Sequence, residues 1–305
     1  MKRVLVFIAH IALLSTISST AFAVTPVKMT TLKPTAQIQL SGDPSDQISS
    51  LQVSPTSIIV TGTSAGAGYM KALDRTGQTQ LWDLHLVSEN STDSMANAVY
   101  REPSGTLWVA GASAIVPAQS TPTPIPSTVL NPSDVMPETT TAIASLTELD
   151  IWKVSSRGLL LGSFKLSMGN VVFPDSISVI GGKVTVGGEI AARIHTRFSI
   201  SMDVSGLFSA PKFSSIKNSA LNSTKEVKTT LSTWKSFITS TPIKGLPSWK
   251  PKANSQVLVR YDGKTKAVKA AYLTSEEILD LAWEKSLGIV LLLSSSSGYA
   301  ISIVK

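Results

Sequence analysis

Gln47–Val87 reads QISSLQVSPTSIIVTGTSAGAGYMKALDRTGQTQLWDLHLV, and this stretch decides the fold class. Its apolar residues form four short runs, separated by turn-forming residues rich in Ser, Pro, Asp and Gly. The runs are Ile48–Val53, Ile58–Thr63, Tyr69–Leu73 and Thr79–Leu86. Four antiparallel strands in about 40 residues are typical of one β-propeller blade.

Variants of this unit recur to the end of the sequence. They occupy residues 93–166, 177–213, 226–273 and 278–304. Inserts at 113–148 and 241–255 interrupt two of them, and the last unit lacks its fourth strand. Ala36–Leu40 is a spare strand of the right pattern. The sequence therefore predicts an all-β fold, a β-propeller of five four-stranded blades in which the N-terminal strand closes the last blade.

Two structural alternatives stay open at this point. The units could belong to an irregular β-sandwich, or a second small domain could begin after residue 215. In the fourth unit, Ser223–Phe237 could form a short helix instead of two strands.

The N-terminus has the features of an export signal. Lys2 and Arg3 precede an apolar run, and Ala21-Phe22-Ala23 fits the small-x-small cleavage rule. We expect residues 1–23 to be a signal peptide and residues 24–305 to be one β-propeller domain without a membrane span. The sequence has no cysteine, which excludes disulfides and thiolate metal sites. A bacterial protein, secreted or held in the cell envelope and monomeric, is the expectation.

The first unit resembles the repeats of bacterial secreted β-propeller proteins. Ile59–Gly62 matches their I-x-V-T-G pattern loosely, and Leu73–Gly77 matches the L-D-x-x-G turn that follows. The resemblance implies a blade. It implies no activity, because many proteins with such blades have no assigned function.

Four acidic residues stand two positions before the first apolar residue of a unit. They are Asp46, Asp93, Asp175 and Glu276. Because the first strand of a blade lies innermost, we expect these side chains near the channel mouth. Converging carboxylates can bind a hard cation such as Ca²⁺, the one cofactor we consider, or act as acid and nucleophile on a glycoside. Local turn hydrogen bonds are the simpler explanation.

The basic excess is concentrated in one segment. Residues 212–269 hold 12 basic and 2 acidic side chains. A predicted loop there carries Lys244, Trp249, Lys250 and Lys252, where the ring could stack on a sugar and the lysines could bind an anionic envelope polymer. No nucleic-acid motif accompanies them, and export argues against a nucleic-acid partner.

A serine motif suggests a hydrolase but fits poorly. Gly62–Gly66 matches the G-x-S-x-G nucleophile elbow around Ser64. An elbow needs a helix after the serine, whereas Gly66 and Gly68 favour a hairpin. Only His85 and His195 could serve as its base in the mature chain.

The sequence thus predicts a binding or interaction module of unknown ligand, more readily than an enzyme. A glycan, an envelope polymer or a protein would bind on the propeller face that carries the two inserts. The alternative is a carbohydrate-active enzyme that uses two of the four predicted acids as a carboxylate pair.

Overall fold

The structure is a computed structural model of the chain. It describes residues 27–115, 146–191, 196–215, 225–227, 234–239, 243, 246 and 255–305. The predicted signal peptide, most of both inserts and the basic loop lie outside the described residues. Among those described, every regular element is a strand, and no helix is long and apolar enough to cross a membrane.

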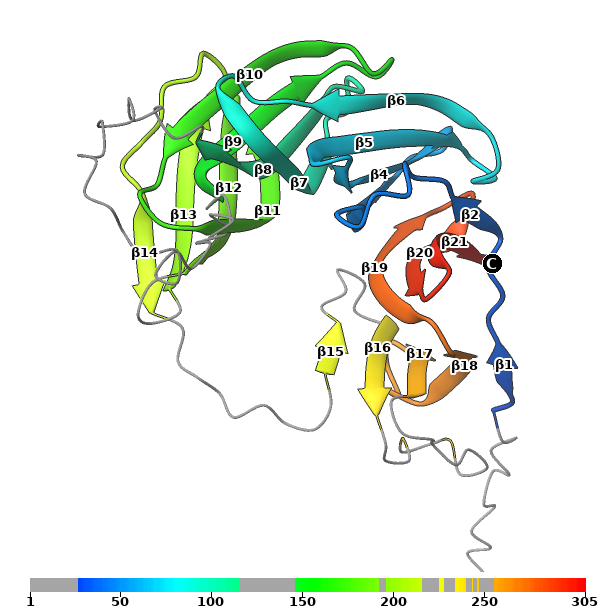
Figure 1. Cartoon of the computed structure of the whole chain (residues 1–305). Coiled ribbons are helices and arrows are strands. Elements are labelled where there is room, and N and C mark those ends of the chain that lie inside the picture. The colour runs from blue at the N-terminus through cyan, green and yellow to red at the C-terminus, as the bar shows by residue number, and fades with distance from the viewer. Residues whose placement is uncertain are drawn as a thin grey trace, which may run out of the picture.

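Sheets one to three follow the chain order, with four antiparallel strands each (Figure 1). Sheet one holds β3 (Gln47–Val53), β4 (Ser57–Ser64), β5 (Ala67–Asp74) and β6 (Gln80–Leu86). Sheet two holds β7 (Ser91–Arg101), β8 (Leu107–Ile115), β9 (Leu146–Val154) and β10 (Leu160–Ser167). Sheet three holds β11 (Val172–Ile180), β12 (Lys183–Ile190), β13 (Thr196–Asp203) and β14 (Lys212–Ser215).

Sheets four and five each take a strand from the N-terminal part of the chain. Sheet four holds β15 (Lys225–Val227), β16 (Trp234–Thr239), β17 (Ser255–Tyr261), β18 (Val268–Thr274) and β1 (Met29–Thr31). Sheet five holds β19 (Glu277–Glu284), β20 (Gly288–Ser295), β21 (Gly298–Val304) and β2 (Ala36–Ile38). The β2 strand pairs antiparallel with β21, with Ala36 opposite Ile301, as the spare-strand pattern predicts.

Three details differ from the sequence-based expectations or decide between them. Residues 29–31, for which the sequence predicts no strand, form β1, which pairs parallel with β18 as a fifth strand of sheet four. Residues 234–239 form a strand, so the helix alternative is wrong there. The serine motif is the predicted hairpin, because β4 ends at Ser64 and β5 begins at Ala67, with Ala65 and Gly66 at positive φ between them.

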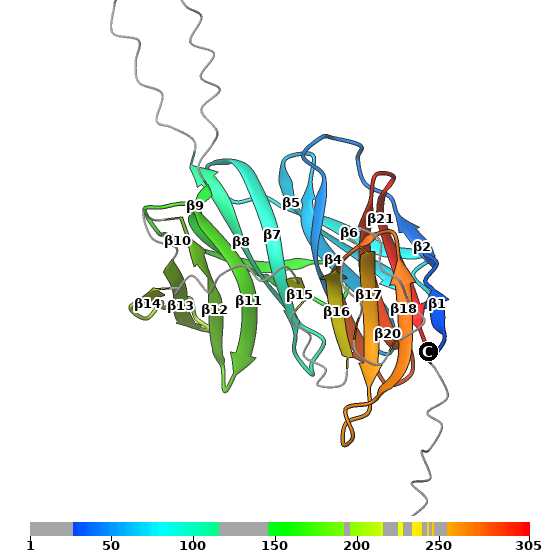
Figure 2. The same cartoon turned by 90° about the horizontal axis from the view of Figure 1, so that it is seen from below.

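The sheets succeed one another around an arc and pack face to face, as expected for a propeller-like fold (Figures 1 and 2). Separate apolar cores join sheet five to one, one to two, two to three, and four to five. No apolar core among the described residues joins sheet three to four. Burial of these faces is the main stabilising term of such a fold.

A β-bulge recurs at the same place in the innermost strands. The register shifts between Ile48 and Ser50 in β3, Ala96 and Ala98 in β7, Pro174 and Ser176 in β11, and Ile278 and Asp280 in β19. Each bulge adds one unpaired residue and bends its strand.

The bulge explains the glycine of the V-T-G pattern. In sheets one to three a glycine of the second strand lies opposite the residue before the bulge. A Cβ atom on Gly62 would lie 1.8 Å from the carbonyl oxygen of Gln47, and one on Gly111 would lie 1.9 Å from that of Met95. On Gly188 the corresponding distance is 2.4 Å, to Phe173. Only glycine allows this approach of two backbones.

The glycine of the L-D-x-x-G turn serves packing between sheets. Gly77, Gly158 and Gly206 all have positive φ. A Cβ atom on Gly158 would lie 2.6 Å from the Trp82 ring of sheet one, and one on Gly206 would lie 2.7 Å from the Phe164 ring of sheet two. The outer strand of one sheet thus packs on the turn of the next.

A partly buried carboxylate joins sheet five to sheet one. Asp280 of β19 accepts hydrogen bonds from the backbone N–H groups of Leu51 (2.8 Å) and Leu281 (2.7 Å). Burial raises the pKa of Asp280 to about 6, and the hydrogen bonds from Leu51, Leu281 and Ser50 limit the rise.

The bulge glycines provide a stability test. We expect Gly62→Ala and Gly111→Ala each to lower the free energy of unfolding by about 2 kcal/mol or more, because a backbone must shift to admit the methyl group. Denaturant titration measures this. Gly162→Ala is the matched control, since its Cβ would only contact the Phe164 ring at 3.8 Å. Equal losses in all three variants would contradict the explanation.

The Asp280 carboxylate provides a pH test. The folded chain keeps a proton on Asp280 up to about pH 6, whereas the unfolded chain releases it near the ordinary value of 3.8. Between these values the folded state binds more protons, so this group lowers stability as pH rises. We expect Asp280→Asn to remove up to about 3 kcal/mol of that decline. Parallel curves for the two proteins from pH 4 to 6 would refute this.

Candidate functional site

Asp46 lies in the loop between β2 and β3 and is satisfied by local hydrogen bonds. Its carboxylate accepts from the N–H groups of Gly42 (2.7 Å) and Ala65 (3.0 Å) and from the Ser41 hydroxyl (2.9 Å). Burial raises the pKa of Asp46, but bonds from Ala65, Ser41 and Gly42 outweigh it and lower the pKa overall. Asp46 also lines a broad hollow of ≈ 690 Å³ beside β2 and β21.

The other three predicted acids have different surroundings. Asp93 is exposed on β7. Asp175 of β11 forms an exposed ion pair with Arg197, with 2.6 Å between the charged atoms. Glu276 is partly buried before β19, and within the described part of the chain its Oε2 atom has no hydrogen-bond partner.

The bulges show that these four acids do not share one register. Asp46 and Glu276 each stand two residues before the residue that precedes the bulge. Asp93 stands three residues before it, and Asp175 is itself the bulged residue. The described residues contain no group of three or more His, Cys, Asp or Glu side chains that could hold a metal ion. Lys244, Trp249, Lys250 and Lys252 lie outside the described residues.

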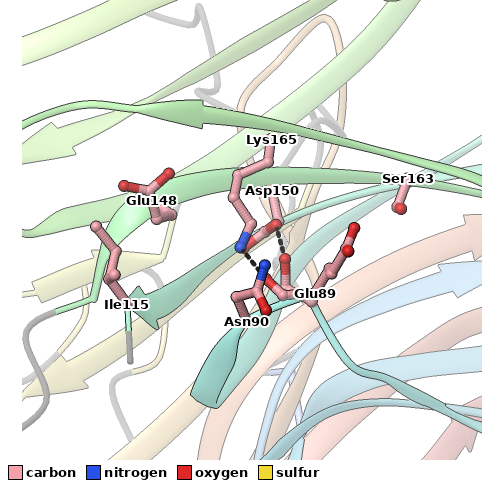
Figure 3. Close-up of a pocket in the computed structure, with 8 residues that line it drawn as sticks. Glu89, Asn90, Ile115, Glu148, Asp150, Ser163 and Lys165 are labelled. Atoms are coloured by element: carbon pink, nitrogen blue, oxygen red, sulfur yellow. Dashed lines mark hydrogen bonds between the residues drawn. The ribbon is translucent and has the colours of Figure 1, made fainter. Parts of the chain in front are cut away.

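A different pair of acids lines a pocket of ≈ 350 Å³ between sheet two and the link from β6 to β7 (Figure 3). Glu148 and Asp150 stand on β9, two residues apart and therefore on one face of the strand. Trp152 follows on the same face and belongs to the core shared with sheet one, whereas Leu149 and Ile151 point into the core shared with sheet three.

Both carboxyl groups are buried, at 5% exposure for Glu148 and 1% for Asp150. The Ser88 hydroxyl donates a hydrogen bond of 2.5 Å to Oδ1 of Asp150. Lys165, opposite Asp150 on β10, donates to the carbonyl oxygen of Glu89 at 2.6 Å (Figure 3). Oε1 of Glu148 and Oδ2 of Asp150 have no partner among the described residues.

The pKa of Asp150 is raised. Burial is the largest cause, and the negative charge of Glu148 adds to it. The hydroxyl groups of Ser113 and Ser88 and the charge of Lys165 act in the opposite direction without cancelling the rise. A carboxyl group in this state can hold a proton for transfer, or can accept a ligand that brings donors or positive charge.

Comparison of the sheets shows why Asp150 is unusual. On the third strand, the residue opposite the bulge glycine is Tyr69 in sheet one and Phe198 in sheet three. Both are buried aromatic side chains. In sheet two the same position holds Asp150, opposite Gly111. The fold accepts an aromatic ring at this position, so it does not itself require a carboxylate.

Glu148 and Asp150 are not among the site residues predicted from the sequence. The signal was present as acids alternating with apolar residues in Thr147-Glu148-Leu149-Asp150 at the start of a buried strand. Aligning the units on the bulge glycine would have placed Asp150 among aromatic residues. The four predicted acids, in contrast, come from comparing the first strands of the units. That comparison does not include third-strand residues such as Glu148 and Asp150.

The buried charge at Asp150 has a measurable effect on stability. In EDTA at pH 7, we expect Asp150→Asn to raise the melting temperature, because the variant no longer buries a charged carboxylate. The gain should shrink as pH falls and the wild-type carboxyl group becomes protonated. A lower melting temperature for the variant at every pH would show that existing hydrogen bonds already compensate the charge.

No protein-family model matches the chain, and no curated protein is similar to it. Among solved structures, the chain is similar to a protein of unknown function from Dyadobacter fermentans, with 10% identity, a TM-score of 0.41, and coverage of 92% of this chain and 84% of that one. A protein of unknown function from Bacteroides caccae has 9% identity, a TM-score of 0.36 and coverage of 84% and 73%.

A xylan beta-1,4-xylosidase from Bacillus halodurans is also similar, with 10% identity, a TM-score of 0.38, and coverage of 83% of this chain and 45% of the xylosidase. Likeness at this level carries no argument about activity. The architecture rests on the sheets themselves, which form an all-β, propeller-like arrangement in the described residues.

Proposed function

We propose that this chain is an exported binding module that takes a hydroxyl-rich ligand, such as a glycan, in the pocket of sheet two. We further propose a closed propeller of five blades, each corresponding to one sheet. The pairing of β2 with β21 supports closure by the N-terminal strand. The signal-peptide pattern of residues 1–23 supports export.

The polar lining of the pocket carries the proposal. Seven of its eight lining residues can donate or accept hydrogen bonds through their side chains, and Ile115 is the apolar exception. They are Ser88, Glu89, Asn90, Glu148, Asp150, Ser163 and Lys165. Its volume is within the range of small-molecule sites, and unpartnered buried acceptors favour a ligand that supplies many donors.

The position of the pocket agrees with a binding role. Ile115 ends β8 and Leu146 begins β9, so the long insert leaves and rejoins sheet two beside the pocket. Loops on a rigid scaffold commonly carry binding residues. The basic loop with Lys244, Trp249, Lys250 and Lys252 is a second proposed contact, for an anionic polymer.

A glycan and envelope-polymer array on the purified protein tests the proposal. We expect Glu148→Gln and Asp150→Asn to weaken binding of a captured glycan at least tenfold, which is about 1.4 kcal/mol. Glu189→Gln on β12 is the control, since that carboxylate is exposed on sheet three. Binding that survives both pocket substitutions would refute this site. Joint neutralisation of Lys244, Lys250 and Lys252 tests the basic loop separately, through the salt dependence of polymer binding.

A glycoside hydrolase is the second candidate, and the carboxyl pair on β9 favours it. Asp150, with its raised pKa, would donate the proton to the leaving oxygen, and Glu148 would act as nucleophile or base. In this candidate function, Glu148 and Asp150 replace the four acids predicted from the sequence, which do not share one register. Those four are Asp46, Asp93, Asp175 and Glu276. Hydrolysis assayed beside the binding array separates the two functions. Turnover lost by more than about 100-fold in Asp150→Asn would favour the enzyme.

A further inference from the structure

Three oxygen atoms without partners lie together in sheet two. They are Oγ of Ser113, Oε1 of Glu148 and Oδ2 of Asp150. Ser113 pairs directly with Glu148 across β8 and β9, and Asp150 stands two residues further along on the same face. The Ser113 hydroxyl lowers the pKa of Asp150, so the two side chains are close, but their geometry does not complete a hydrogen bond between them. All three residues are at least nine-tenths buried.

Leaving such atoms unpartnered is costly. Each unmade hydrogen bond of a buried polar group lowers stability, and an uncompensated buried carboxylate lowers it more. The remaining unpartnered buried atoms of the described residues are the indole nitrogens of Trp108 and Trp152 in sheet two and single oxygens of Thr61, Gln256 and Glu276 elsewhere. The grouping of three in sheet two therefore points to a bound species that supplies positive charge.

The charge of the pocket suits a cation. Its lining holds three acids, Glu89, Glu148 and Asp150, against one base, Lys165, which is a net charge of −2 when all are ionised. The Lys165 ammonium group is engaged by the carbonyl oxygen of Glu89. On β10, Lys165 pairs with Asp150, whereas Glu148 pairs with Ser167, two residues further along β10. The side toward Glu148 and Ser113 is thus left to another cation.

We infer that Ser113, Glu148 and Asp150 bind a calcium ion. All three ligands are hard oxygen donors, and the set contains no imidazole or thiolate that would favour zinc. Calcium accepts six to eight oxygens in irregular geometry, so water and ligand oxygens can complete a partial protein shell. Magnesium needs a closer approach to ideal octahedral geometry.

A calcium ion would also explain how the proposed pocket holds a glycan. This part of the inference rests on the proposed function. The ion sits in the same pocket, with coordination positions open toward it. Paired hydroxyl groups of a glycan can replace water at those positions. The carboxylates then recognise the ligand through the ion as well as through direct hydrogen bonds.

Calcium titration of the purified protein, after EDTA treatment and without glycan, tests the inference. We expect calorimetry to show one site, and CaCl₂ to raise the melting temperature by about 3 °C or more relative to EDTA. Glu148→Gln and Asp150→Asn should each weaken calcium binding at least tenfold, whereas Glu189→Gln should leave it unchanged. No binding at millimolar CaCl₂, or unchanged binding in both pocket variants, overturns the site.

Terbium luminescence locates the ion independently of those two variants. Trp152 follows Asp150 on the same face, so terbium bound there should emit when tryptophan is excited, and calcium should quench the emission by competition. Trp152→Phe should reduce the emission while calorimetric calcium binding persists. Emission unaffected by this substitution would place the ion elsewhere and overturn the assignment. Glycan binding measured in EDTA is a separate readout, because it tests the proposed binding function without a calcium ion.

Discussion

In three of the sheets, a carbonyl oxygen of the innermost strand approaches the second strand so closely that only glycine fits opposite it. The approach arises from the bulge in the innermost strand, which adds a residue and bends the strand. The same bend brings the bulge region against the neighbouring sheet. There Ser49 donates to the carbonyl oxygen of Ala96, and Asp280 accepts from the Leu51 N–H group. One backbone feature thus fixes pairing within a sheet and contact between sheets.

The turn glycines complete this arrangement at the outer edge. Trp82 and Phe164 each pack on the turn of the following sheet, where a side chain would collide with the ring. Successive sheets therefore touch at the inner bulge and, for sheets one to three, also at the outer ring. Apolar cores then fill the space between them, and among the described residues only Lys71, Glu148 and Asp150 are both charged and fully buried. Against that background, Asp150 stands out as a buried carboxylate at a position where sheets one and three place aromatic rings.

Sequence reasoning reached the architecture because strand periodicity and turn residues are local signals. The pattern around Val60-Thr61-Gly62 repeats for a steric reason, and so do the turns ending at Gly77, Gly158 and Gly206. The short parallel strand β1 was missed because its partner, β18, is far away in sequence. The acid series failed as a common register because the first apolar residue of a unit does not stand at one place relative to the bulge. Ile48 and Ile278 directly precede it, whereas Met95 stands one residue earlier and Ile177 lies beyond it.

The site was harder to predict because its signal is a departure from the repeat. Tyr69 and Phe198 show that an aromatic ring satisfies the position opposite the bulge glycine. Asp150 at that position replaces the ring with a carboxyl group, so apolar packing is lost and a charge is buried. Glu148 adds a second buried charge on the same strand. Both changes lower stability unless a ligand compensates them. Since sheets one and three fold without such a pair, the carboxylates of sheet two are better explained by what the pocket binds than by the needs of the fold.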